Sequence, residues 1–95
     1  MTIDQAIQEL QAAGASLRCS KLKRMLESLG FEVRDGKKAG HKIVYHSGLP
    51  NFNGSAYTCG HGRNPEVKPN YVRSMLKMIR HHEDALRQLL KEEKP

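Results

Sequence analysis

The 95-residue chain contains only two cysteines, Cys19 and Cys59, and no apolar run long enough to cross a membrane. Two cysteines are too few for the disulfide framework of a small secreted domain, and they fit a reducing compartment. A membrane-spanning helix needs about 20 apolar residues, and a signal peptide needs an apolar segment near the N-terminus. Neither pattern is present, and the first residues include the acidic Asp4. We therefore expect a cytoplasmic protein with no membrane partner.

Several common catalytic motifs are also missing. The sequence has no Gly-rich phosphate-binding loop of the P-loop or dinucleotide type, and no motif centred on a nucleophilic serine. Aspartate and glutamate are scattered over predicted helix faces, which does not support a two-metal nuclease site. Cys59, His61, His81 and His82 fit no familiar zinc spacing, and adjacent helical histidines point about 100° apart. The sequence predicts neither a metal nor another cofactor.

Positive charge is what the chain has in excess. Sixteen lysines and arginines face ten acidic residues, for a formal net charge of +6. Such an excess favours phosphate-bearing partners or an acidic protein, although charge alone does not determine a fold. The length predicts one domain with a single modest core.

Apolar residues at helical spacing predict three helices, at 2–13, from Ser16 to Leu29, and from Pro69 towards the charged end. Ser16 is the candidate N-cap of the second helix, and Pro69 is well placed as the first residue of the last one. The polar residues 81–84 interrupt the last helix, so we expect it either to bend there or to project its final third away from the core.

Two local signals mark helix ends. Thr2 and Gln5 have capping-box spacing at the start of the first helix. Gly30 follows the second helix, where a residue in the left-handed conformation is expected.

Three short β-prone runs follow, at 31–34, 40–46 and 55–59, and Gly, Pro and Asn residues separate them. This pattern predicts a three-stranded antiparallel meander. Side-chain alternation places His41, Ile43 and Tyr45 on one face of the middle strand and Lys42, Val44 and His46 on the other. Because both faces carry apolar residues, the alternation leaves open which face meets the helices. The order of elements is that of an α+β, double-stranded-RNA-binding-like α-β-β-β-α fold with an extra N-terminal helix.

Part of the chain resembles the HicA family, the small toxins of bacterial HicA–HicB toxin–antitoxin pairs. The similarity covers about residues 17–80, in order and without large gaps. It rests on 26–33, Gly40-His41-Lys42-Ile43, His46, His61-Gly62, 64–69 and Val72-Arg73. The most specific segment is Asn64–Pro69, which leads into a helix. We interpret residues 1–95 as a single HicA-like domain, in which 1–14 form an added helix and 81–95 a helical extension.

The resemblance implies ribonuclease activity against messenger RNA and inhibition by a HicB-like antitoxin. The family's functional residue is a histidine at the start of the second strand, and the matching residue here is His41. In the family, Gly, a small hydroxyl residue and His or Asn usually precede it. This chain departs from that pattern, with Lys38-Ala39-Gly40 in front of His41.

Metal-independent RNA cleavage needs a base for the 2′-hydroxyl proton and an acid for the leaving oxygen. Histidine suits both roles because its ordinary pKa of about 6.5 lies near cellular pH. We expect His41 to act as general base or general acid, and the alternative is an ordinary exposed strand histidine. The cations expected to hold RNA phosphates are Lys37, Lys38, Lys42 and Arg34. The alternative for them is a solvated basic hairpin.

Other side chains near the predicted sheet are expected to be structural. His46 has the opposite strand parity from His41, so the two should leave opposite faces. His61 is expected to hold its loop rather than contact RNA. Tyr45 and Tyr57 are candidates for stacking on unpaired bases, but core packing is the commoner role of such residues.

Three functions remain open from the sequence. The first is a HicA-like ribonuclease toxin, and the second is a non-catalytic RNA-binding module of the same fold. The third is an interaction protein that assembles through the C-terminal helix, where Leu86, Leu89 and Leu90 lie.

Overall fold

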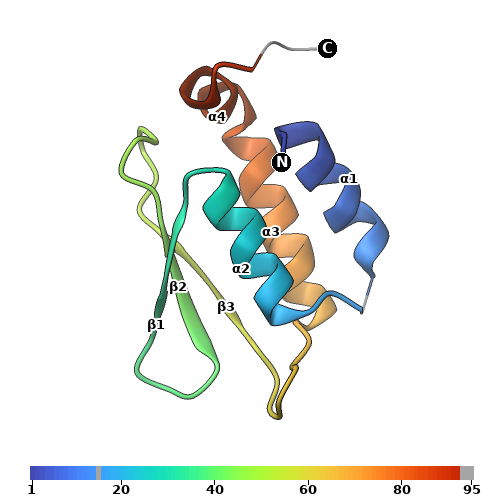
Figure 1. The fold of residues 1–95 in the computed structure, drawn as a ribbon. Helices are drawn as coiled ribbons and strands as arrows, with labels where there is room; N and C mark the ends of the chain where they lie inside the picture. Colours follow the sequence, from blue (N-terminus) through green and yellow to red (C-terminus); the bar gives the residue numbers. More distant parts are fainter. Residues whose placement is uncertain (15, 93–95) are drawn as a thin grey trace.

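A computed structural model describes residues 1–14 and 16–92. The elements, in chain order, are α1 (Ile3–Ala13), α2 (Cys19–Ser28), β1 (Glu32–Asp35), β2 (His41–Tyr45), β3 (Ser55–Thr58), α3 (Pro69–His81) and α4 (Glu83–Leu90). The chain is therefore an α+β protein with the expected α-β-β-β-α order at its centre and a further helix at each end (Figure 1). Residues 93–95, the end of the expected C-terminal extension, lie outside the described residues.

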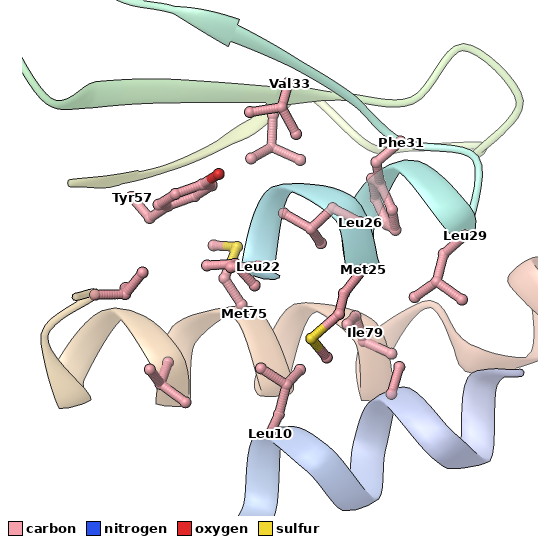
Figure 2. Close-up of a cluster of buried hydrophobic side chains, with 14 of the residues drawn as sticks. Leu10, Leu22, Met25, Leu26, Leu29, Phe31, Val33, Tyr57, Met75 and Ile79 are labelled. Atoms are coloured by element: carbon pink, nitrogen blue, oxygen red, sulfur yellow. The ribbon is translucent and has the colours of Figure 1, made fainter. Parts of the chain in front are cut away.

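The helices cover one face of the sheet. The sheet is an antiparallel meander in the order β1-β2-β3. α2 and α3 lie against it, and α1 packs on the side of α3 that faces away from the sheet (Figure 1). Figure 2 shows the resulting core between these layers, formed by Leu10, Leu22, Met25, Leu26, Leu29, Phe31, Val33, Tyr57, Met75 and Ile79.

Strand register settles which face of the sheet is buried. Val33 pairs with Val44, and Lys42 pairs with Tyr57. Val44 and Tyr57 are completely buried. Because side chains alternate along a strand, His41 and Ile43 must point to the opposite face, which no described helix covers.

The local helix signals have mixed outcomes. The capping box of Thr2 and Gln5 is present, and Gly30 adopts the left-handed conformation at φ +93°. The prediction of Ser16 as an N-cap is wrong, because α2 begins only at Cys19, after Arg18, and no side chain caps it. A tertiary contact determines this start, since the Cys19 N–H donates to the carbonyl of Pro65 at 2.9 Å.

The last helix begins at Pro69 as predicted, and it bends at His82, between α3 and α4, which is one of the two outcomes expected for residues 81–84. The His82 ring packs edge-on against Phe52, with the ring centroids 5.3 Å apart. Burial, followed by the nearby charges of His81 and His46, lowers the pKa of His82. Leu86 of α4 is completely buried, so the bend returns the chain to the core. None of the described helices is long and apolar enough to cross a membrane.

A buried arginine joins α1 to α4. Arg87 is only 4% exposed, and its guanidinium donates to Asp4 of α1 at 2.7 Å and to Glu83 at 3.0 Å. Glu92 lies 3.8 Å from the same group. The two terminal helices are thus connected by charge-assisted hydrogen bonds as well as by apolar packing.

The two cysteines are bonded to each other, whereas the sequence led us to expect cysteines in a reducing compartment. The structure joins Cys19 to Cys59 by a disulfide, with their Cα atoms 5.8 Å apart and a sequence separation of 40. A single disulfide is not the framework of a disulfide-rich domain, but it links the start of α2 to the end of β3.

We predict that Arg87→Met lowers the midpoint of thermal unfolding by several degrees. Methionine retains much of the buried stem but leaves Asp4 and Glu83 without their cation, and removing one partner of a buried ion pair is destabilising. Arg80→Met is the matched control, because Arg80 is exposed on α3. Circular dichroism melts of both variants test this, and an unchanged midpoint for Arg87→Met would contradict it.

Candidate functional site

An open depression of about 570 Å³ lies on the uncovered face of the sheet, and His41 is part of its wall. The other lining residues are Lys37, Lys38, Ile43 and Thr58. His41 and Ile43 come from β2, Thr58 from β3, and the two lysines from the β1–β2 turn. The depression therefore combines one titratable ring, two cations, a hydroxyl and an apolar side chain.

Backbone hydrogen bonds within the β1–β2 turn fix the main chain of His41. The Gly36 N–H donates to the His41 carbonyl at 2.7 Å, and the His41 N–H donates to the Lys38 carbonyl at 3.1 Å. Gly36 also lies directly against the imidazole, so that a Cβ at this position would collide with the ring. Backbone hydrogen bonds and packing together restrict where the His41 side chain can lie.

Gly40, which directly precedes His41, is in contact with the end of β3. Its φ is +80°, and a Cβ on it would lie 2.7 Å from the Cys59 carbonyl oxygen. The Cys59 N–H donates to the Gly40 carbonyl at 2.8 Å. Glycine is needed here both for the left-handed backbone and for this close approach. The lead-in Lys38-Ala39-Gly40, although unlike the usual family pattern, forms an ordered turn.

Of the four predicted phosphate-binding cations, only Lys37 and Lys38 line the His41 depression. Lys37 and Lys38 are exposed at the depression, and neither forms an ion pair within the described residues. Arg34 instead donates to Glu32 at 2.8 Å, and this hydrogen bond raises the pKa of its guanidinium. Arg34 also lies over the Tyr45 ring, 5.3 Å from its centroid. It lines a neighbouring depression rather than that of His41.

Lys42 is separated from His41 by strand parity. Its register partner is the buried Tyr57, and its ammonium group pairs with Asp35. The hydrogen bond from Lys42 lowers the pKa of the Asp35 carboxyl. A lysine already paired to a carboxylate, on the face opposite His41, is poorly placed to contact the same phosphate as His41.

The remaining histidines near the sheet lie apart from His41. The His46 ring packs edge-on against Phe31 at 4.8 Å, and its Nδ1 accepts a hydrogen bond from the Gly48 N–H at 3.1 Å. His46 follows the last residue of β2 and does not line the His41 depression; it lines the neighbouring one instead. His61 is exposed in the loop after β3 and does not line the His41 depression.

The two tyrosines have different environments. Tyr57 is a core residue, as expected, and burial raises the pKa of its phenol to about 12. Its hydroxyl has no hydrogen-bond partner among the described residues. Tyr45 is 39% exposed on the uncovered face, where Arg34 covers its ring, so core packing does not describe it.

Sequence reasoning missed Thr58 as a member of the site. Thr58 is the register partner of His41, and its hydroxyl donates to the hydroxyl oxygen of Tyr71 on α3 at 3.4 Å. Ile43 could have been included, because it shares the parity of His41. Thr58 could not, because its position beside His41 depends on the pairing register of β2 with β3.

Within residues 1–14 and 16–92, no group of three or more His, Cys, Asp or Glu side chains is placed to hold a metal ion. Comparison of the chain with models of known protein families, with curated proteins and with solved structures finds no match in any of the three. The site must therefore be interpreted from its own geometry.

We predict that Gly36→Ala displaces the His41 ring, because the added methyl group occupies the space of the imidazole. Gly60→Ala is the matched control, since a Cβ there meets only ordinary van der Waals contacts. The measurement is the NMR chemical shift of the His41 ring protons and carbons in both variants. A larger shift in Gly36→Ala is expected, whereas equal shifts in the two variants would show that Gly36 does not determine the ring position.

Proposed function

We propose that the protein is a HicA-like ribonuclease toxin that binds messenger RNA and cleaves it through acid–base catalysis at His41. The observation that carries this proposal is the position of His41, half-buried in an open depression beside two exposed lysines. The resemblance of residues 17–80 to the HicA family supports the same conclusion. A cytoplasmic location goes with this function.

The proposed reaction uses His41 as one of its two proton-transfer groups. A base removes the proton of a ribose 2′-hydroxyl, and the resulting oxygen attacks the adjacent phosphorus. The bond to the 5′-oxygen breaks, and that oxygen receives a proton from an acid. The products are a 2′,3′-cyclic phosphate and a 5′-hydroxyl. His41 serves as the base or the acid because its ordinary pKa is near neutrality.

The neighbours of His41 have complementary roles in this proposal. Lys37 and Lys38 offset the negative charge on the phosphoryl oxygens. Ile43 provides apolar surface for a ribose or base. Arg34 and Tyr45, in the adjacent depression, extend the surface along the strand and offer a stacking platform to a neighbouring nucleotide.

The proposed protein partner is a HicB-like antitoxin that covers His41 and the lysines of the turn. Such a partner needs an acidic surface, because a basic one would place like charges opposite Lys37 and Lys38. Covering the open depression is sufficient for inhibition, since RNA then has no access to His41.

A second candidate is a non-catalytic RNA-binding module. The observation that favours it is that the described residues lining the depression include one histidine and no carboxylate, whereas the proposed cleavage needs both a base and an acid. A binding module needs the lysines and the apolar surface but no proton transfer. The two candidates therefore differ in the effect of removing His41.

We predict that induction of the parent protein in bacteria arrests growth and depletes transcripts, and that His41→Ala at a matched protein level does neither. His61→Ala is the control, because this exposed histidine lies outside the depression. Growth curves and transcript integrity provide the readout. Equal toxicity of the parent and His41→Ala would place the active group elsewhere, and harmlessness of both would favour the binding module.

We predict that a Lys37→Gln, Lys38→Gln double variant binds single-stranded RNA more weakly, and that its salt dependence is shallower. Each phosphate contact adds about 0.7 to the slope of log affinity against log salt for a single strand, so the slope should fall by about 1.4. The variants carry His41→Ala to keep the RNA intact. A Lys77→Gln, Lys91→Gln double variant provides the same charge change away from the site. An equal loss of slope in both pairs would contradict a specific role for the turn.

A further inference from the structure

The Cys19–Cys59 disulfide lies next to the turn that presents His41. Cys59 directly follows β3, and Cys19 is the first residue of α2. The register partner of His41 is Thr58, the residue before Cys59. The disulfide therefore connects the helical layer to the strand end that flanks the candidate site.

Backbone contacts extend from Cys59 to His41. The Cys59 N–H donates to the Gly40 carbonyl at 2.8 Å, and the Cys59 carbonyl lies against the Cα of Gly40. Gly40 precedes His41 and holds a left-handed conformation that few other residues adopt. Any displacement of Cys59 must change the hydrogen bond and the contact that keep this glycine in place.

The disulfide also lies beside backbone hydrogen bonds that join the start of α2 to residues 65–67. The Cys19 N–H donates to the Pro65 carbonyl, and the Val67 N–H donates to the Leu17 carbonyl at 2.8 Å. Cys59 forms an isolated bridge with Val67. The start of α2, the segment 65–67 and the end of β3 are thus held together by a few hydrogen bonds and one covalent bond.

We propose that Cys19 and Cys59 form a thiol-redox modification site whose state controls the order of the Gly40–His41 turn. In the disulfide form, the end of β3 is fixed to α2, and the turn is held. In the dithiol form, Cys59 is released, and the turn opens more often. Only the consequence for RNA cleavage rests on the proposed function, since the change in the turn does not require it.

The reaction partner is a dithiol reductant. One of its thiolates attacks a sulfur of the disulfide, forms a mixed disulfide, and releases the other cysteine as a thiolate that takes up a proton. The second thiol of the reductant then displaces the remaining cysteine, and the reductant leaves as its own cyclic disulfide. In total, two electrons and two protons pass from the reductant to the protein.

Burial makes this site slow to react. Cys19 is 8% exposed and Cys59 is 5% exposed, so attack requires local opening. The nearby segment 61–64 is exposed. Because the disulfide closes a long loop, its loss should lower the midpoint of thermal unfolding by roughly 10–20 °C.

The test compares the full chain in its oxidised and reduced forms, with dithiothreitol as the reductant. Thiol alkylation followed by mass spectrometry first counts free cysteines after oxidation with glutathione disulfide. Hydrogen exchange then measures the amides of Cys59 and His41 and, as a reference, amides in the middle of α3. The experiment is run well below the unfolding midpoint of the reduced form.

We expect no free thiols in the oxidised protein. On reduction, protection of the Cys59 and His41 amides should fall at least tenfold more than protection in α3. A Cys19→Ser, Cys59→Ser variant should show the same amide protection as the reduced parent, and dithiothreitol should not change that protection. If this variant does not fold, the parent in its two forms still provides the test.

Three results would overturn the proposal. These are two free thiols after oxidation, unchanged protection at the turn, or an equal loss of protection throughout the chain, which would indicate only a general stabilising effect. RNA cleavage by the two forms is measured separately. Absence of cleavage in both forms would count against the ribonuclease function and would leave the exchange result to decide the redox site.

Discussion

Burial of one sheet face by α2 and α3 determines where the candidate functional side chains of the strands lie. Val44 and Tyr57 are completely buried on that face, and strand alternation then directs His41 and Ile43 to the opposite, uncovered face. The same alternation places Lys42 on the helix-facing side. A register slip of one residue would bury His41 and expose Val44, so the apolar core itself maintains the position of the candidate site.

The β1–β2 turn then restricts the position of the His41 ring. Gly36 packs against the His41 ring, and Gly40 is in contact with the Cys59 backbone. A functional side chain needs such support from its surroundings to hold a productive geometry. Lys37 and Lys38 are exposed on the same turn, so one short segment carries both the imidazole of His41 and two cations. This concentration explains how a small sheet can bring a histidine and two lysines together at one place.

Much of the fold could be predicted from local signals. The order of elements, the capping box at Thr2 and the first residue of α3, Pro69, all follow from propensity and spacing. Ser16 failed as an N-cap because the start of α2 is determined by a hydrogen bond to Pro65, 46 residues from Cys19 in the chain. Local sequence contains no information on such a contact.

The candidate site was also only partly predictable, because some of its members are adjacent in sequence and others depend on contacts between strands. His41 and the turn lysines are adjacent in sequence, so a pattern could find them. Pairing of Arg34 with Glu32, and of Lys42 with Asp35, depends on rotamers and register. Strand parity already separated Lys42 from His41.

The most direct test of the account is cleavage of a 5′-labelled single-stranded RNA by the purified parent protein in the presence of EDTA. The account predicts fragments that end in a 2′,3′-cyclic phosphate from the parent protein, and no fragments when His41 is replaced by alanine. Intact RNA at every pH, or cleavage that requires a divalent metal and leaves 3′-hydroxyl ends, would contradict acid–base catalysis at His41.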